Sequence, residues 1–251
     1  MDKGKVIDKQ KKNQILEKKL MSKINKTIEK YQLIEDGDRI LLGLSGGKDS
    51  LVLLKSLAWK KKRSQISFTV TAIYIDILNI PYSANIEYLE TFCKENDIQF
   101  VNERVTDDFD LKSSDKNPCF LCSWDRRKHL FSIANSGKYN KLALGHHLDD
   151  AVETLLMNMM YQANISALAP KLSMFEGELI VIRPLLETKE SLIEEFAISQ
   201  NFQPMLKTCL YEKVSSRQFV RDILSKMEDN YDRAKNNIFI SMSHIDKEYL
   251  P

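Results

Sequence analysis

A short glycine turn between two apolar runs constrains the fold of this chain more than any other feature. Residues 45–50 read Ser-Gly-Gly-Lys-Asp-Ser; they follow the apolar run 39–44 and precede the apolar run 51–54. This order predicts a buried strand, a tight turn and a helix that begins at the turn. Adjacent glycines let the backbone approach a ligand closely, and the unpaired N–H groups of a first helical turn attract anions. The segment therefore predicts a phosphate-binding loop.

The side chains of this loop fit the same interpretation. Ser45 and Ser50 can donate hydroxyl hydrogen bonds, Lys48 supplies a mobile positive charge, and Asp49 can cap the helix or contact Mg²⁺. The alternative is an ordinary surface turn, since Ser-Gly-Gly is common in loops. The segment matches neither the G-x-x-x-x-G-K-[ST] loop nor the G-x-G-x-x-G fingerprint of other nucleotide-binding classes. The predicted nucleotide-binding residues of the loop are Ser45, Gly46, Gly47, Lys48, Asp49 and Ser50.

Length and composition predict one large α/β domain in a cytoplasmic protein. The chain has 251 residues, 43% of them hydrophobic, and no apolar stretch approaches the roughly 18 residues of a membrane span. Its first residues are rich in lysine rather than apolar, so we expect no export signal and no membrane association. Four unevenly spaced cysteines in such a chain suit reduced thiols or metal ligands better than a disulfide framework.

Positive charge is concentrated at the start of the chain. Residues 1–30 hold ten lysines and four acidic residues, whereas the whole chain has a net charge of only +2. A second basic run, at residues 60–63, ends the helix expected after the glycine turn. Such patches suit a polyanion such as RNA, and they equally suit solvated helix faces. Charge alone does not decide between the two.

Predicted strands that alternate with predicted helices along the chain indicate a doubly wound α/β fold with a parallel sheet. Strands are expected at 39–44, 68–75, 98–101, 141–145 and 179–182; helices are expected after residues 47 and 148 and at 83–96, 120–136, 188–200, 214–228 and 231–242. Residues 103–118 read as a polar loop, and Gly137 as a helix C-cap. The first segment reads as an amphipathic helix whose buried stripe is Ile15, Leu20, Ile24, Ile28 and Tyr31.

The pattern divides the chain into two parts. Residues 1–36 form a basic N-terminal helical extension, and residues 37–251 form the α/β domain together with its C-terminal helices. In doubly wound sheets, ligands bind beyond the carboxyl ends of the strands at the switch point of the strand order. Gly145 and His146 follow one of the predicted strands. We therefore expect them to reach the same site as the glycine turn.

Two groups of charged residues are candidates for this site. Asp149 and Asp150 can cap the helix that they begin and hold Mg²⁺ on a triphosphate; the alternative is capping alone. Arg126, Arg127 and Lys128 point at successive angles of a predicted helix, so at least one should face the pocket. For these three the alternative is a surface charge cluster.

Two cysteines lie three positions apart where a loop enters a helix. Cys119 and Cys122 follow Pro118, and the positive end of a helix lowers thiol pKa values. With Cys209 as a third thiolate they suit an Fe–S cluster whose last iron is open, whereas structural zinc would need a further cysteine or histidine pair. A dithiol without metal stays open as an alternative. Cys93, in an apolar helical stretch, is expected to be plain core.

In combination these motifs resemble the tRNA 2-thiocytidine synthetase family of the PP-loop ATP pyrophosphatases. The resemblance runs from about residue 17 to near the C-terminus. Its segments, in order, are SGGKDSLVLL at 45–54, PCFLC at 118–122 with the arginines after it, LGHHLDDAVETLLMNMMY at 144–161 and APKLSMFEGELIVIRPL at 169–185. A related 2-thiouridine family carries additional zinc-binding C-x-x-C pairs, which this sequence does not contain.

The resemblance implies an ATP-dependent sulfurtransferase. Such an enzyme adenylates the C2 carbonyl of an anticodon-loop cytidine, position 32, and replaces its oxygen with sulfur. The implied cofactors are ATP, Mg²⁺ and a [4Fe-4S] cluster, and the implied partners are tRNA, a sulfur donor (sulfide or sulfur derived from a cysteine desulfurase) and a second copy of the chain in a homodimer. The implied cluster ligands are Cys119, Cys122 and Cys209.

The same resemblance assigns catalytic roles to three residues. Asp49 would be the acid of the phosphate loop, and Asp150 would assist Mg²⁺ or nucleotide binding. Arg126 would stabilise charge at the α-phosphate or hold the nucleobase, which is a form of electrostatic catalysis. Gly145 and His146 join the loop residues as predicted nucleotide-binding residues.

Two departures from the family pattern leave the substrate open. In the family the third cysteine usually belongs to a second proline-preceded C-x-x-C, whereas Cys209 stands alone and a polar run after it is replaced by residues 211–214. The chain is also somewhat short for the family. Thiolation of another nucleotide or of a small molecule therefore stays open. So do a PP-loop ligase that forms amide or lysidine-type products and a nucleotide-binding, cluster-bearing protein that binds RNA or senses redox state without turnover.

Overall fold

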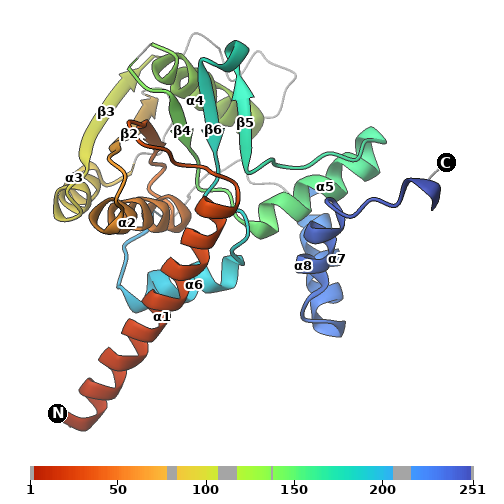
Figure 1. The fold of residues 1–251 in the computed structure, drawn as a ribbon, viewed down its shortest axis with the longest axis horizontal. Helices are drawn as coiled ribbons and strands as arrows, with labels where there is room; N and C mark the ends of the chain where they lie inside the picture. The colour runs from red at the N-terminus through yellow and green to blue at the C-terminus, as the bar shows by residue number, and fades with distance from the viewer. Residues whose placement is uncertain (1–2, 78–83, 107–117, 137, 206–215, 250–251) are drawn as a thin grey trace.

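The strand order of the sheet reverses between its two central strands, β1 (Arg39–Gly43) and β4 (Lys141–Ala143). The computed structural model describes residues 3–77, 84–106, 118–136, 138–205 and 216–249, with the backbone alone described at 3–9 and 118–124. Within these residues the sheet order is β3-β2-β1-β4-β6-β5 (Figure 1). The strands are β1 (Arg39–Gly43), β2 (Thr69–Ile77), β3 (Gln99–Val105), β4 (Lys141–Ala143), β5 (Lys171–Met174) and β6 (Leu179–Ile182). All pair in parallel except β5, which runs antiparallel to β6.

Helices cover both faces of this sheet. They are α1 (Lys3–Lys30), α2 (Lys48–Arg63), α3 (Ile86–Glu95), α4 (Pro118–Ala134), α5 (Leu148–Gln162), α6 (Glu190–Ser199), α7 (Ser216–Asn230) and α8 (Ala234–Ser241), with short 3₁₀ turns at Phe175–Gly177 and Lys247–Tyr249. Alternate residues of a strand point to opposite faces. Ile40 and Leu42 of β1 therefore join the core formed with α1, α2, α3 and α6, and Leu41 joins the core formed with α4. The predicted doubly wound α/β fold is confirmed.

The N-terminal helix packs against the same core as the sheet. Leu20, Met21, Ile24 and Ile28 of α1 are buried there, against α2 and α6. Ile15, which was expected in this stripe, is 67% exposed, so the buried face begins later along the helix. The division of the chain at residue 36 stays a prediction.

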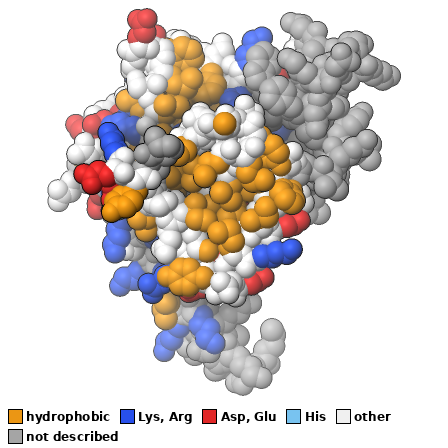
Figure 2. Space-filling model, turned by 90° about the vertical axis from the view of Figure 1, so that its right-hand side faces the viewer, with side chains coloured by type: hydrophobic (Ala, Val, Ile, Leu, Met, Phe, Trp, Pro, Cys, Tyr) orange, Lys and Arg blue, Asp and Glu red, His pale blue; other side chains and the backbone are white. Residues whose placement is uncertain are grey.

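The C-terminal helices pack on α5 rather than on the sheet. Val220 and Leu224 of α7 share a buried cluster with Leu148 and Val152 of α5, and Figure 1 shows α7 and α8 beside that helix. Figure 2 views this side of the molecule, where apolar side chains gather at the surface. The exposed ones on α5, α7 and α8 include Met159, Met160, Tyr161, Phe219, Met227 and Ile240. The expected homodimer stays a prediction. No helix in the described part of the chain combines the length and apolar character needed to cross a membrane.

Most predicted elements are present within a few residues of their expected bounds, with two corrections. Residues 103–105 were expected in a loop and instead extend β3, where they pair with Ile75 to Ile77 of β2. The edge strand β5 was not predicted, because its four residues are half-buried or exposed and show no apolar run. Gly137, the expected C-cap, and Cys209 lie outside the described residues.

Candidate active site

The two polar segments of the site follow the two central strands. β1 leads through the glycine turn into α2, and β4 leads through Gly145 and His146 into α5. Because β1 and β4 are parallel neighbours, both segments leave the sheet at the same edge, at the switch point of the strand order. The structure thus brings together the two segments that the sequence placed at one site.

The turn after β1 is sharpest at Gly46. This residue has a φ of +81°, and a Cβ there would lie 3.2 Å from the Cβ of Ala84. Gly47 is the N-cap of α2; because it has no side chain, it leaves the first-turn N–H groups open to a ligand. Ser50 Oγ accepts the N–H of Ser45 at 3.2 Å and donates to the Gly47 carbonyl at 2.9 Å, which holds the turn closed.

Gly145 lets the segment after β4 pass close to the start of α2. A Cβ at this position would lie 3.2 Å from both the carbonyl carbon of Asp49 and the nitrogen of Ser50. These atoms belong to backbone and cannot rotate away as a side chain can. Gly145 therefore fixes how closely α5 and the phosphate loop approach each other.

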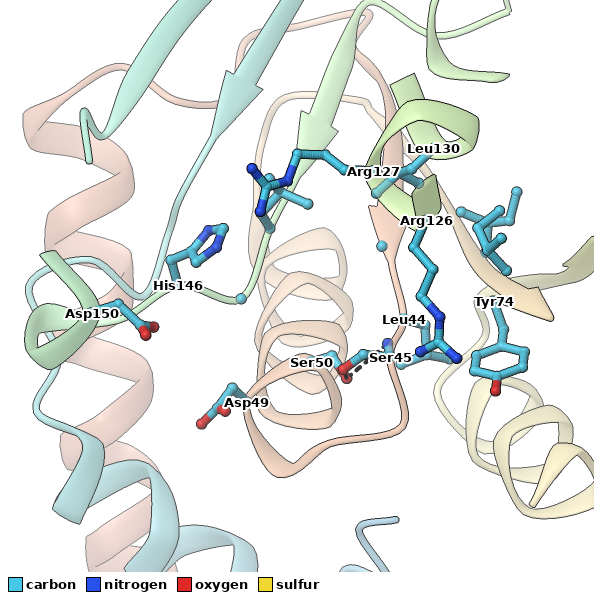
Figure 3. Close-up of a pocket in the computed structure, with 15 residues that line it drawn as sticks. Leu44, Ser45, Asp49, Ser50, Tyr74, Arg126, Arg127, Leu130, His146 and Asp150 are labelled. Atoms are coloured by element: carbon cyan, nitrogen blue, oxygen red, sulfur yellow. Dashed lines mark hydrogen bonds between the residues drawn. The ribbon is translucent and has the colours of Figure 1, made fainter. Parts of the chain in front are cut away.

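A cavity of about 350 Å³ opens between these segments and α4 (Figure 3). Its polar wall consists of Ser45, Asp49, Ser50, Arg126, Arg127, His146 and Asp150, and its apolar wall of Leu44, Ile73, Ile75, Leu130 and Leu144 together with the ring of Tyr74. In Figure 3, Arg126 extends toward Tyr74 and Ser45, whereas Arg127 extends toward His146. The two neighbouring arginines of α4 thus serve opposite sides of the cavity.

Asp49 and Lys48 begin α2 and face other charged groups. Lys48 Nζ lies 2.6 Å from Glu190 Oε1 and 3.5 Å from Asp49 Oδ1. Burial raises the pKa of Asp49, and the nearby carboxylates of Glu190 and Asp150 add to the effect. Asp49 Oδ1 is buried and finds no hydrogen-bond partner among the described residues. Asp49 does not cap α2, which was one of the two roles that the sequence allowed.

The paired acids at the start of α5 have separate roles. His147 is the N-cap: its Nδ1 accepts the N–H of Asp150, and Asp150 Oδ2 accepts the N–H of His147 in return. Asp150 also lines the cavity. Asp149 turns away from the cavity, since its two oxygens accept the N–H of Glu190 and the ammonium of Lys235, each at 2.7 Å. Burial raises the pKa of Asp149, but the two hydrogen bonds outweigh this effect, so the pKa is lowered.

His146 is held by an arginine that follows β6. Arg183 Nε donates to His146 Nδ1 at 3.4 Å, and Arg183 Nη1 donates to the carbonyl of Ala169 at 2.5 Å. Burial lowers the pKa of His146 to about 4, opposed by Asp150 and reinforced by Arg183 and Arg127. The imidazole is therefore neutral at neutral pH.

The structure describes the cysteines unequally. Cys119 and Cys122 belong to the first turn of α4, with only their backbone described, and Cys209 lies outside the described residues. Met205 lies just before that undescribed segment, and its N–H donates to the Gly46 carbonyl at 2.9 Å. Cys93 is buried in α3, where burial raises the pKa of its thiol to about 12. It packs as core, as expected.

Sequence reasoning missed three residues of the site. Glu190 and Arg183 come from segments far from the phosphate loop in sequence, and His147, next to His146, was not among the predicted site residues. The position of Arg183, directly after a buried strand, was a usable signal, because the carboxyl ends of parallel strands meet at one edge. Glu190 gave no such signal.

The chain is similar in sequence to a known protein family and to named relatives. Residues 16–227 match the family described as PP-loop domain. A tRNA-cytidine(32) 2-sulfurtransferase from Polynucleobacter necessarius subsp. necessarius (strain STIR1) is 35% identical over 240 residues, which cover 94% of this chain and 78% of that protein. A tRNA-cytidine(32) 2-sulfurtransferase 2 from Francisella tularensis subsp. holarctica (strain FTNF002-00 / FTA) is 35% identical over 235 residues, which cover 92% of this chain and 87% of that protein.

A solved structure is similar over nearly the whole chain. The U34-tRNA thiolase NcsA from Methanococcus maripaludis, with its [4Fe-4S] cluster, superposes with a TM-score of 0.78 at 26% sequence identity. The superposition covers 93% of this chain and 82% of that chain.

Proposed function

The chain belongs to the tRNA-cytidine(32) 2-sulfurtransferase family of PP-loop proteins, and on that premise we propose that it is an ATP-dependent enzyme that thiolates tRNA at C2 of an anticodon-loop cytidine, position 32. The reaction has two stages. The C2 oxygen of the cytidine bonds to the α-phosphorus of ATP, and pyrophosphate leaves. Sulfur at the oxidation level of sulfide then bonds to C2, and AMP leaves with the original oxygen.

The start of α2 and the acids beside it fit ATP bound together with Mg²⁺. Mg²⁺ prefers carboxylate and phosphate oxygens and keeps several waters. Asp49 and Asp150 place carboxylates at the cavity wall, and the buried Oδ1 of Asp49 has no hydrogen-bond partner in the described residues. No group of three or more histidine, cysteine, aspartate or glutamate side chains within the described ranges is placed to hold a metal ion. Mg²⁺ would therefore take its remaining ligands from ATP and water.

The cavity also accounts for the rest of the nucleotide. The triphosphate would lie on the N–H groups of the glycine turn, with Ser45, Ser50 and Lys48 beside it. The apolar wall of Leu44, Ile73 and Ile75 suits the adenine ring. Arg126, on the same side as Ser45 in Figure 3, is placed to stabilise negative charge that develops at the α-phosphate.

One observation supports the sulfur part of the proposal: helix α4 contains two of the proposed thiolates and an arginine that lines the cavity. Its first turn contains Cys119 and Cys122, and Arg126, one turn later, lines the ATP cavity. Positions 119, 122 and 126 have the spacing of one helix face. Cys209, the third proposed thiolate, lies outside the described residues. Three thiolates suit a [4Fe-4S] cluster, which when bound would supply the site at which sulfur is held.

The proposal is tested by anaerobic purification with iron and sulfide analysis, followed by nucleoside analysis of tRNA incubated with ATP and sulfide. We expect about four irons and four sulfides per chain and the formation of 2-thiocytidine. Cys209→Ala should lose the iron, whereas Cys93→Ala, which removes the buried core thiol, is the matched control and should keep it. A chain that holds no iron after reconstitution would instead support a nitrogen-transferring PP-loop ligase.

A substitution at Asp49 tests adenylation independently of cluster binding. Asp49→Asn should abolish pyrophosphate release that depends on tRNA, because it removes a carboxylate from the proposed Mg²⁺ site. The visible absorbance of the cluster should be unchanged, since that residue is not among the proposed thiolate ligands. Normal pyrophosphate release from the variant would reject this role. A cytoplasmic location, a sulfur donor such as sulfide or desulfurase-derived sulfur, and a homodimer complete the proposal.

A further inference from the structure

The side of the cavity opposite Arg126 carries a positive group that the proposed ATP site does not use. Arg127 is exposed on α4, lines the cavity and extends toward His146 (Figure 3). Within the described residues, its guanidinium makes neither a hydrogen bond nor an ion pair. An arginine aimed into a cavity has five donors to offer to a ligand.

A second guanidinium lies near the first. Arg183 is 7% exposed and is fixed by the Ala169 carbonyl and the His146 ring, neither of which carries negative charge. Burial lowers the pKa of Arg183, and the charge of Arg127 lowers it further, so the two cations repel each other. Both remain protonated at neutral pH. Arg127 and the His146 ring, which Arg183 holds, lie at the cavity wall, so an anion bound there would be stabilised by both positive charges.

His146 adds a third donor to the same wall. Its Nδ1 accepts the hydrogen bond from Arg183, and its pKa of about 4 keeps the ring neutral. In a neutral imidazole whose Nδ1 accepts, Nε2 carries the proton and is a donor. The positive field extends to α7, because Arg217 also lowers the pKa of His146. Asp150 is the acid that opposes this field, and it belongs to the proposed Mg²⁺ side.

We propose that Arg127, Arg183 and His146 form an anion subsite that binds a phosphodiester of the RNA substrate, next to the nucleotide that enters the cavity. The inference rests on the proposed function. The bound group has the chemistry of a phosphate, which either ATP or RNA could supply. RNA is favoured because the glycine turn, Lys48 and the α2 N-terminus already provide donors for the triphosphate, and Arg127 points to the other side of the cavity.

The test compares Arg127→Gln with Arg104→Gln, which removes an exposed arginine on β3 outside the cavity. Binding of unmodified tRNA at several salt concentrations and binding of Mg·ATP are measured on both variants. We expect Arg127→Gln to weaken tRNA binding by about ten-fold and to reduce its salt slope by about one, with Mg·ATP binding unchanged. Arg127→Lys should restore part of the tRNA affinity, since it keeps the charge and loses the bidentate fork.

Other outcomes separate the inference from its premise. Weaker Mg·ATP binding with unchanged tRNA binding would assign the anion to ATP and overturn the RNA assignment. Unchanged binding of both ligands would overturn the subsite itself. A wild-type chain that binds Mg·ATP but no tRNA would refute the proposed function. It would also refute the assignment of the bound anion to RNA.

Discussion

At the scale of single residues, Gly145 is a position where one added methyl group would meet backbone rather than a side chain. Its Cβ would meet backbone atoms of Asp49 and Ser50 at 3.2 Å, so α5 and the phosphate loop would have to separate. We expect Gly145→Ala to lower the free energy of unfolding by about 1–3 kcal/mol, which is typical of overpacking. Denaturant unfolding measures this difference.

Gly47→Ala is the matched control for this prediction. Gly47 has a φ of −75°, which alanine adopts without strain, and a Cβ there would meet only Ser45 Oγ at 3.4 Å. We expect its stability to stay within about 1 kcal/mol of wild type. Equal stability of the two alanine variants would show that the close approach at Gly145 is relieved at no cost.

Glu190 should restrain the lysine of the phosphate loop before ATP arrives. Lys48 Nζ lies 2.6 Å from its carboxylate, so binding of the triphosphate must compete with this ion pair. We expect Glu190→Gln to tighten ATP binding measured without Mg²⁺ by about two- to five-fold, the range of a partly exposed ion pair. Glu194→Gln, an exposed position of the same helix, is the control. Weaker ATP binding in the Glu190 variant would mean that the carboxylate helps to position Lys48 for the nucleotide.

Single residues also mark the limit of what could be predicted from the sequence. The glycine turn has a local signal, because its residues are contiguous and their backbone chemistry is distinctive. Asp149 and Asp150 are adjacent and chemically alike, and distant contacts, the Glu190 N–H and Lys235 of α8, determine which acid turns away from the cavity. Glu190 is 142 positions from Lys48, and no pattern in the sequence around either residue indicates their contact.

At the scale of elements, continuous apolar runs predicted the central strands, and helical periodicity predicted the helices that cover them. β1 and β4 are buried on both faces, so after the first residue of each, Arg39 and Lys141, their sequences contain no polar side chain. β5 lies at the sheet edge with half its residues exposed, and its sequence lacks that signal. The packing of α7 and α8 on α5 was also not predictable, since an amphipathic helix shows that it has a partner but not which one.

Ion pairs that involve these helices predict how the stability of the fold depends on pH. Glu228 of α7 lies 2.7 Å from Lys189 and 2.6 Å from Lys235. Burial raises the pKa of Glu228, but the hydrogen bonds from the two lysines outweigh this effect, so the pKa is lowered. A carboxyl with a folded-state pKa below its unfolded value stabilises the fold above the unfolded pKa, and this contribution is lost as the pH falls through the folded one.

We therefore expect Glu228→Gln to lower the free energy of unfolding by about 1 kcal/mol at pH 7. The difference from wild type should shrink as the pH falls below about 4, where the wild-type carboxyl takes up its proton. Urea unfolding across this pH range measures it, with Asp229→Asn, an exposed neighbour, as the control. A difference that is constant with pH would assign the loss to packing rather than to charge.

At the scale of the whole molecule, the two basic runs of the sequence have different surroundings. Lys60 and Lys61 of α2 lie 3.5 Å and 3.7 Å from Glu29 and Asp97, so part of that run is neutralised within the fold. The N-terminal half of α1 instead projects away from the sheet in Figure 1. Its lysines are therefore the better candidates for contacts with a polyanion outside the domain.

Removal of residues 1–12 tests this candidate without disturbing the rest of α1. The deletion takes away five lysines and two aspartates, and it ends before Asn13, whose side chain donates to the Ser199 carbonyl at 3.1 Å. Each lysine that contacts a phosphate adds about 0.7–0.9 to the slope of log affinity against log salt. We expect tRNA binding to weaken most at low salt and the slope of log affinity against log salt to become shallower, as measured by filter binding.

Replacement of the five lysines by glutamine should reproduce the effect while the helix is kept. The double variant Lys60→Gln with Lys61→Gln should have little effect on tRNA binding. Equal affinity of the deletion and the wild type at low salt would return these lysines to the role of a solvated helix face.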